Sequence, residues 1–326
     1  MEIRPLGSSG LSVTPIGLGL AALGRPAYID LGRERDLGPE RSPEAMRARC
    51  HAVLDAAFDA GIRYVDAARS YGDAERFLST WLAGRGSTVA ELTVGSKWGY
   101  TYVADWRMDA DVHEVKDHSL QTLRRQVGES RALLGSRLAL YQIHSATLES
   151  GVLEDRGVLE ELVRLRGDGL AIGLTTSGAR QGETVRRALQ VRVAGERPFD
   201  VVQATWNPLE PSAGPALAEA KEAGWGVIVK EAVANGRLVP GAPDLPRELD
   251  SVAERCGATV DQVAIAAALE NPWADMVLSG AVTEGQVRSN AGAAEIGLEP
   301  GDLDALAGLA EPPERYWAAR SALPWR

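Results

Sequence analysis

Short apolar runs alternate with amphipathic segments along most of the chain. The apolar runs have the length of strands, whereas the segments between them carry apolar residues at helical spacing. Several ends are well marked: Ser42-Pro43 is typical of an N-cap followed by a first-turn proline, and Gly61 stands where a helix ends. The predicted strands are residues 16–20, 62–66, 92–97, 139–144, 171–175, 201–205, 226–230 and 276–279.

The pattern between these strands predicts helices over residues 43–60, 74–83, 112–134, 155–166, 180–191, 214–223, 259–269 and 284–291. Strands that alternate with helices form parallel βα units, because parallel neighbours need a crossover connection. We therefore expect an α/β fold, a closed (β/α)8 barrel of the TIM type, rather than an open doubly wound sheet. Residues 1–326 are expected to form a single domain. Segments 2–5 and 11–15, separated by Gly-Ser-Ser-Gly, predict an N-terminal β-hairpin that plugs the barrel floor.

Three segments are longer than ordinary connections: residues 21–41, 98–111 and 298–326. The first two follow the carboxyl ends of strands, the face where barrel enzymes keep their chemistry. Their aromatic residues have two possible roles: they pin the loops to the barrel, or they line a substrate pocket. The candidates for that pocket are Tyr28, Trp98, Tyr100 and Trp106, and the tail adds Tyr316, Trp317 and Trp325.

Composition narrows the class of protein. No apolar stretch approaches the roughly 18 residues of a membrane helix, and the N-terminus lacks a signal peptide, so we expect a cytoplasmic protein. A net charge of −10 argues against nucleic acid or an anionic membrane as the main partner. Cys50 and Cys256 are isolated from each other and from histidine pairs, which predicts neither a disulfide nor a metal site.

Four polar side chains fall at the carboxyl ends of neighbouring strands. Asp66, Lys97 and His144 end the second, third and fourth predicted strands, and Tyr71 follows in the loop after the second. Any one of them alone could be a loop carboxylate, a half-buried phenol, a snorkelling lysine or a core histidine. Because strand ends meet at one face of a barrel, we expect the four to converge.

Together these groups form an apparatus for moving a proton to an oxygen. A free tyrosine has a pKa of about 10, which a nearby ammonium lowers, while a carboxylate holds that ammonium in place. A histidine orients a carbonyl oxygen and stabilises the charge that develops on it. The four residues contain no hydride donor, so the chemistry needs a nicotinamide cofactor.

At this point the chain resembles the aldo-keto reductase superfamily from end to end. RPLGSSGLSVTPIGLG resembles the N-terminal hairpin and first strand of that family, and GIRYVDAARSYGDAE matches its G-x-x-x-x-D-x-A-x-x-Y-G-x-x-E signature. TVGSKW carries the family lysine and LYQIHS the histidine. VVQATWNPLE and SGAVTEGQVRSNAGA resemble its cofactor segments.

The resemblance implies a role for each matching residue. It implies a catalytic tetrad, with Tyr71 as the general acid, made of Asp66, Tyr71, Lys97 and His144. It implies NADPH as the cofactor, in preference to NADH, extended across the barrel mouth. Trp206 would then stack against the nicotinamide and Gln203 would bind its carboxamide, whereas Gln286 and Asn290 would hold the adenosine end.

The cofactor segments also depart from the family pattern. After the fifth strand the family usually reads G-x-S-N, whereas Thr175 and Thr176 stand here at the pair that binds the carboxamide. After the seventh strand the usual S-P-L is replaced, so that Lys230 either meets the cofactor pyrophosphate or pairs with Glu231. Arg237 looks better placed for phosphate.

The positions that usually carry a base for the 2′-phosphate of NADPH are a further departure. They are Gly280, Ala281 and Gln286 here, which leaves Arg288 as the nearest base. The preference for NADPH therefore has less support in the sequence than the tetrad.

The sequence thus favours an NAD(P)H-dependent oxidoreductase that interconverts a small-molecule carbonyl and an alcohol, with secondary or sugar metabolism as its candidate settings. Two alternatives within the family remain: a non-catalytic NADPH-binding regulatory subunit, and an enzyme acting as oxidase, epimerase or imine reductase. A barrel aldolase with Lys97 or Lys230 as a Schiff-base nucleophile is another, although it leaves the Asp66–Tyr71 spacing unexplained. We expect a monomer or a small homo-oligomer.

Overall fold

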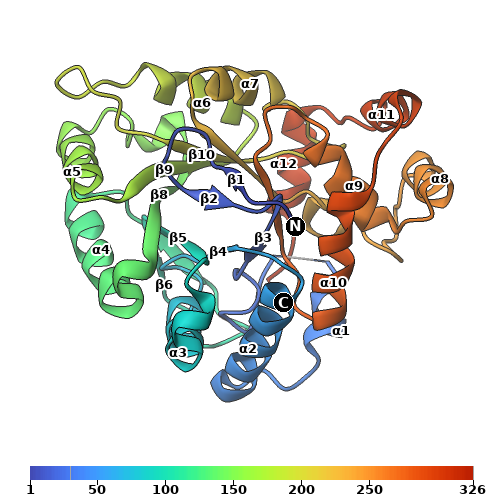
Figure 1. The fold of residues 1–326 in the computed structure, drawn as a ribbon, viewed down its shortest axis with the longest axis horizontal. Coiled ribbons are helices and arrows are strands. Elements are labelled where there is room, and N and C mark those ends of the chain that lie inside the picture. The colour runs from blue at the N-terminus through green and yellow to red at the C-terminus, as the bar shows by residue number, and fades with distance from the viewer. Residues whose placement is uncertain (30, 326) are drawn as a thin grey trace.

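The computed structural model describes residues 1–29 and 31–325. Within them, parallel strands close into a barrel in the order β10-β11-β12-β3-β4-β5-β8-β9 (Figure 1). These strands are β3 (Ile16–Gly19), β4 (Tyr64–Asp66), β5 (Thr93–Trp98), β8 (Leu138–Ala146), β9 (Ala171–Thr176), β10 (Val201–Thr205), β11 (Gly226–Lys230) and β12 (Met276–Ser279). The expectation of a (β/α)8 barrel is confirmed.

Helices surround the barrel, and most begin and end close to the predicted positions. Those between or after barrel strands are α2 (Pro43–Asp59), α3 (Ala74–Arg85), α4 (Leu120–Leu134), α5 (Arg156–Gly167), α6 (Gln181–Gln190), α7 (Gly214–Glu222), α9 (Val260–Leu269) and α10 (Glu284–Gly292). Short 3-10 turns are η1 (Gly86–Val89), η2 (Gly135–Arg137), η3 (Leu148–Ser150), η4 (Ala234–Gly236) and η5 (Ala293–Glu295). Ser42 caps α2 by accepting from the Ala45 N–H, as the sequence predicts.

The N-terminal hairpin lies at the barrel floor. Its strands are β1 (Arg4–Pro5) and β2 (Ser12–Val13), which pair antiparallel. Leu6 and Val13 are fully buried against inward-facing residues near the amino ends of the strands, including Tyr64, Leu140 and Ile228. The hairpin therefore closes the bottom of the barrel, and any cavity must open at the other end.

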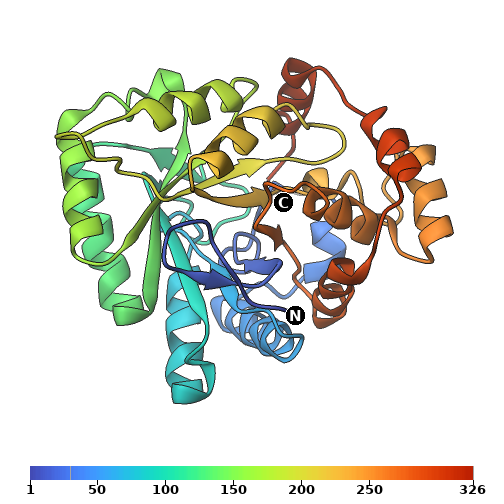
Figure 2. The ribbon, with the colours of Figure 1, turned by 45° about the horizontal axis from the view of Figure 1, so that its top comes forward.

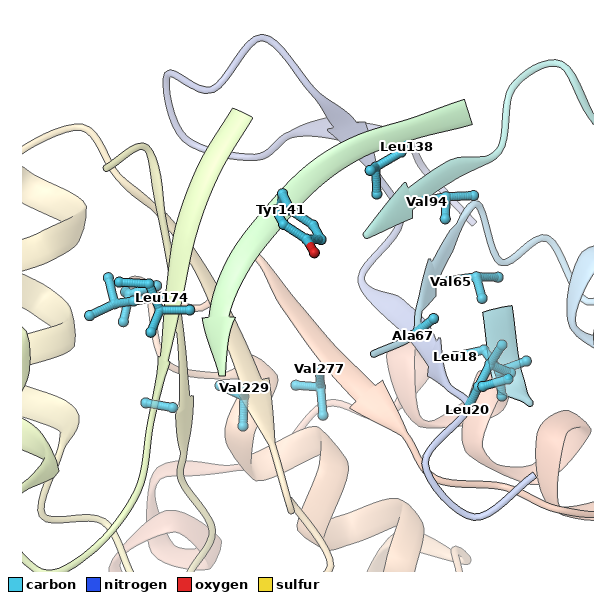
Figure 3. Packing of buried hydrophobic residues seen from close by; sticks show 14 of the residues in the cluster. Leu18, Leu20, Val65, Ala67, Val94, Leu138, Tyr141, Leu174, Val229 and Val277 are labelled. Carbon is cyan, nitrogen blue, oxygen red and sulfur yellow. The ribbon is translucent and has the colours of Figure 1, made fainter. Parts of the chain in front are cut away.

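The larger core lies between the strands and the helices. Strand side chains alternate, so that Val227 and Val229 belong to this outer cluster while Ile228 packs in the barrel floor. Figure 3 shows members of the outer cluster, among them Leu18 and Val65, on successive strands. The interior is thus left to the alternate positions, which carry the polar candidates.

One predicted helix is too long. Residues 112–119 are not helical: β6 (Tyr100–Tyr102) and β7 (Glu114–Lys116) form an antiparallel hairpin above the barrel. The helix α4 begins only after Ser119, whose side chain accepts from the Thr122 N–H. The strongest start signal in this region is therefore that N-cap and not the upstream apolar residues.

Helices also stand where the sequence analysis expected only loops. They are α1 (Arg33–Leu37), α8 (Arg247–Cys256), α11 (Pro300–Ala307) and α12 (Pro313–Ser321). Figure 2 shows α11 and α12, in red, on the flank of the barrel that carries α8 and α9. A second core cluster joins these elements through Leu249, Val263, Leu306 and Tyr316. No helix in residues 1–29 and 31–325 is long and apolar enough to cross a membrane.

Candidate active site

The structure brings the predicted tetrad together at the carboxyl end of the barrel. Lys97 Nζ is paired with Asp66 Oδ1, donates to the Ala67 carbonyl at 3.0 Å and lies 3.2 Å from the Tyr71 hydroxyl oxygen. Asp66 and Lys97 are 1% and 2% exposed. Gln203 Nε2 donates to the other carboxylate oxygen of Asp66 at 2.8 Å. These contacts leave Lys97 no free donor for a substrate, so its ammonium serves Tyr71.

Two further residues of the tetrad loop have structural roles. Gly72 has φ +56°, and a side chain there would meet the Gly24 carbonyl oxygen at 2.3 Å, so only glycine fits. Glu75 is buried and accepts from the hydroxyls of Ser96 and Ser130, both at 2.6 Å. Its other oxygen accepts from Arg69 Nη1 at 2.5 Å. The loop that carries Tyr71 is thereby fixed to β5 and α4.

His144 faces Tyr71 across the site. Their rings stand nearly perpendicular, at an interplanar angle of 84° with 5.5 Å between centroids, and Tyr100 lies 5.0 Å from the His144 ring. His118 Nε2 lies 2.9 Å from the His144 carbonyl oxygen and holds the backbone there. Tyr100 therefore lies beside the tetrad, and its role as a pocket residue stays a prediction.

Arg25 is a site residue that the sequence analysis missed. It is 2% exposed, pairs with Glu114 at 2.9 Å, and its guanidinium carbon lies 5.3 Å from the centroid of the Tyr71 ring. The same guanidinium lies 5.0 Å from the Tyr28 ring and 4.7 Å from the Trp325 ring. The sequence RPAY after a strand does not indicate a site residue, because Arg25 meets Glu114 from β7 and Trp325 from the C-terminal tail.

Burial and neighbouring charges set the protonation states of Tyr71 and His144. Burial raises the pKa of Tyr71 well above 10.0, the Asp66 carboxylate raises it further, and the Arg25 guanidinium opposes both. The net shift is therefore upward, opposite to the lowered pKa that the sequence analysis expected, because burial and Asp66 outweigh the nearby cations. Burial, followed by the charges of Lys97 and Arg25, lowers the pKa of His144 well below 6.5. At neutral pH the phenol keeps its proton and the imidazole is uncharged.

A cavity of about 440 Å³ begins at Asp66, Tyr71 and Lys97 and extends to α10. Its wall at the tetrad includes Asp66, Tyr71, Lys97, Gln203 and Tyr28, and Lys230 lies among them. At the far end Gly280, Gln286 and Asn290 line it. The sequence analysis assigned each of these residues to the substrate pocket, the tetrad or the cofactor, and the cavity joins them.

Lys230 pairs with Glu231, which was one of the two roles that the sequence analysis left open for it. Its Nζ lies 3.7 Å from Glu231 Oε1 and donates to Thr205 Oγ1 at 2.7 Å. Burial lowers the pKa of Lys230 to about 8. Arg320 on α12 donates from Nε to both oxygens of Glu231 at 3.0 Å. The C-terminal helix is thus fixed to the barrel mouth by an ion pair at the site.

Four predicted contacts do not reach the cavity. Trp98 is fully buried among the outer core because the strand turns Lys97 inward and its neighbour outward. Trp106 donates to the Arg41 carbonyl at 2.7 Å and so pins its loop. Trp206 packs edge-on against Trp273, and Arg237 pairs with Glu311. The cavity wall contains none of these side chains, so the pocket, nicotinamide and phosphate roles expected of them stay predictions without support from the cavity.

Thr175 and Thr176 are buried at the end of β9 and lie behind the cavity wall. Thr175 Oγ1 accepts from the Ser145 N–H at 2.7 Å. Thr176 Oγ1 is buried with no hydrogen-bond partner among the residues the structure describes. The pair expected to bind the carboxamide is therefore near the tetrad, with one hydroxyl already committed to the backbone.

Comparison with known proteins assigns this arrangement to a family. The Aldo/keto reductase family model matches residues 15–311. The chain belongs to this family. The match makes the protein an oxidoreductase that acts on carbonyls with a nicotinamide cofactor.

Two curated relatives are similar to this aldo-keto reductase. One is aldo-keto reductase str7 of Strobilurus tenacellus, 26% identical over 96% of this chain and 93% of its own length. The other is pyridoxal 4-dehydrogenase of Microbacterium luteolum, 30% identical over 41% of this chain. That second match spans only 40% of the dehydrogenase.

Solved structures of aldo-keto reductases share the fold. One from Pseudomonas aeruginosa is 25% identical, with a TM-score of 0.65 and coverage of 90% of this chain and 93% of that chain. The holo form of another, from Bacillus halodurans, is 21% identical with a TM-score of 0.72, covering 96% and 97%. These likenesses agree with the barrel and its order of strands.

The residues present fit a nicotinamide dinucleotide. The cavity is elongated along the barrel mouth, from the tetrad to α10. At the α10 end Asn290 donates to Ser279 Oγ at 2.8 Å, while its Oδ1 is buried and has no partner among the described residues. An unpaired buried acceptor is costly, so it suits a ligand that brings an N–H group, as an adenine amine does.

Proposed function

We propose that this oxidoreductase interconverts a ring-bearing carbonyl compound and its alcohol, with Tyr71 as the proton donor to the carbonyl oxygen. The observation that carries the proposal is the 3.2 Å contact between Lys97 Nζ and the Tyr71 hydroxyl, with His144 on the other side of the ring. Bound nicotinamide would supply or accept the hydride. The remaining steps belong to this chain.

Tyr71 would hold the proton until the carbonyl oxygen gains charge. Its raised pKa keeps the phenol protonated, and Lys97 then stabilises the phenolate left after proton transfer. Asp66 holds Lys97 in place, and Gln203 in turn fixes Asp66. Neutral His144 offers one N–H to orient the same oxygen. In the oxidative direction the same groups would remove the alcohol proton.

The aromatic side chains gathered around Tyr71 support a substrate with a flat or ring-shaped apolar face. Tyr28 lines the cavity, Tyr100 lies against His144, and Trp325 contacts Tyr28 edge-on with 6.2 Å between centroids. Aromatic walls pack against rings and CH faces alike. The relative whose name states its substrate acts on pyridoxal, an aromatic aldehyde, which is consistent with this class.

Nucleotide titration followed by turnover tests the proposal. NADH and NADPH would each be titrated by fluorescence, and hydride transfer would then be followed on a panel of aromatic, sugar and aliphatic aldehydes and alcohols. We expect at least one nucleotide to bind and the aromatic members to turn over with the highest kcat/KM. Failure to bind either nucleotide would contradict the proposal. Binding without turnover on any member would favour the regulatory-subunit alternative.

A further inference from the structure

The end of the cavity farthest from the tetrad is built by three elements. The residues after β12 and the first turns of α10 contribute Gly280, Gln286 and Asn290, and α9 contributes Asp261. Gln262 Nε2 donates to the Ser289 carbonyl at 2.8 Å, which places the start of α9 beside α10. The short helix α1 lies beside α10 on the other side (Figure 1).

Helix α1 brings a carboxylate to this end. Gln286 Nε2 donates to Asp36 Oδ2 at 2.8 Å, a contact between residues 250 positions apart. The other end of the Gln286 amide accepts from the Val282 N–H at 2.9 Å, which fixes its orientation. Gln286 and Asp36 both line the cavity. The Asp36 carboxylate is therefore held at the cavity wall by the Gln286 amide, whose orientation the Val282 N–H fixes.

The charge at this end is unsuited to a phosphate. Arg288, the base that the sequence analysis left for the 2′-phosphate, is 64% exposed, pairs with Glu284 and lines a separate surface pocket. Gly280 and Ala281 carry no charge. Among the described side chains that line this end, Asp36 and Asp261 are acidic and Arg35 is basic. The positions that match the family's base for the 2′-phosphate thus carry none, and Asp36 brings a carboxylate beside them.

We propose that this end of the cavity receives an adenosine ribose with a free 2′-hydroxyl, so that the protein binds NADH and NAD+ in preference to NADPH and NADP+. This inference rests on the proposed function. A carboxylate accepts a hydrogen bond from a ribose hydroxyl and repels a phosphate at the same position. Asp36 and the oriented Gln286 are then the residues that determine nucleotide specificity, which reverses the preference implied by the family resemblance.

The test measures dissociation constants rather than turnover. NADH and NADPH are titrated into the full chain at one ionic strength, with nucleotide fluorescence as the signal. We expect NADH to bind at least about tenfold more tightly than NADPH. Asp36→Asn removes one charge at the wall and is expected to narrow that ratio at least about fivefold, mainly by tightening NADPH.

The matched control is Glu34→Gln. Glu34 is on the same short helix and its substitution removes the same charge, but it does not line the cavity. We expect Glu34→Gln to leave the ratio unchanged within about twofold. An equal shift in Glu34→Gln and Asp36→Asn would overturn the inference, because it would assign the effect to overall charge.

Three other results are decisive. Tighter binding of NADPH than of NADH by the unmodified chain would overturn the inference and leave the proposed function intact. A selective loss of NADPH affinity in Arg35→Gln, with NADH unaffected, would also overturn it, because Arg35 would then hold a 2′-phosphate. Failure of both nucleotides to bind would overturn the proposed function and the inference with it. The ratio of the NADPH and NADH dissociation constants in the unmodified chain tests the nucleotide preference even where a variant does not fold.

Discussion

The ammonium of Lys97 lies 3.2 Å from the hydroxyl oxygen of Tyr71 and is paired on its other side with the buried carboxylate of Asp66. Burial raises the pKa of Tyr71, so the resting phenol is protonated even beside the ammonium of Lys97. The lysine therefore matters after the proton has left, when a phenolate must be stabilised.

Lys97→Met is expected to lower kcat at least about 100-fold, the usual contribution of acid–base catalysis, with little change in nucleotide Kd. It also leaves the Asp66 carboxylate buried without its cation, at a cost of roughly 3–5 kcal/mol in unfolding free energy. The double variant Asp66→Asn with Lys97→Met removes that cost. Stability should therefore return in the double variant while kcat stays low, as measured by thermal melts and steady-state kinetics. Recovery of kcat together with stability would show that Lys97 acts only as a structural residue.

The pH profile should carry the titration of Lys230 and not that of His144. Lys230 has a pKa of about 8 and lines the cavity, so it loses its positive charge as pH rises through about 8. We expect kcat/KM to fall there, because the anionic nucleotide and the substrate carbonyl oxygen, as it gains negative charge, lose an attractive neighbour. Lys230→Met should remove that fall. The neutral state of His144 predicts no inflection near pH 6.5. A fall near pH 8 that persists in Lys230→Met would refute this assignment.

Glu231 should make stability sensitive to acid. Burial alone raises the pKa of Glu231, but Arg320 and Lys230 more than offset this and lower it to about 2. A depressed carboxyl pKa contributes stability above its ordinary value of 4.5 that is lost as pH falls toward 2, here on the order of 3 kcal/mol. Urea unfolding of the unmodified chain and of Glu231→Gln should therefore diverge at pH 7 and converge as pH falls. Parallel curves would contradict the ion pair.

Trp325 should affect the substrate more than the nucleotide. Its ring stacks on His113 with 4.4 Å between centroids and lies over Arg25, which in turn lies over Tyr71. Trp325→Ala is expected to raise KM for an aromatic aldehyde about tenfold without changing nucleotide Kd. Trp106→Phe, at a loop anchor away from the cavity, is the control and should leave KM unchanged. Equal effects on KM in the two variants would show that Trp325 has no specific role toward the substrate.

Much of the site was predictable because it depends on strand periodicity. Asp66 ends β4 and Lys97 lies one residue before the end of the adjacent β5, both at inward-facing positions, so the closure of the barrel brings them together. The same alternation turns Trp98, the neighbour of Lys97 in the extended strand, outward. The sequence analysis expected Trp98 in the loop after this strand, whereas β5 extends to include it.

The residues that were missed or misplaced depend on contacts between distant segments. Arg237 pairs with Glu311 and Glu231 with Arg320, and both partners belong to a tail that the sequence pattern left as a loop. Asp36 reaches Gln286 only because a short helix forms in the loop after β3. A five-residue helix has too few positions for a periodic signal, so no pattern within residues 21–41 indicated it.

The central claim is that Tyr71 donates the proton, and a single-turnover measurement with Tyr71→Phe tests it most directly. The variant keeps the ring that packs beside His144 and Arg25 but removes the hydroxyl. Enzyme preloaded with reduced nucleotide is mixed with an aromatic aldehyde, and nucleotide oxidation is followed by absorbance. We predict a rate of hydride transfer at least about 1,000-fold lower, with nucleotide Kd within about twofold of the unmodified chain. A single-turnover rate within about tenfold of the unmodified chain would contradict the account.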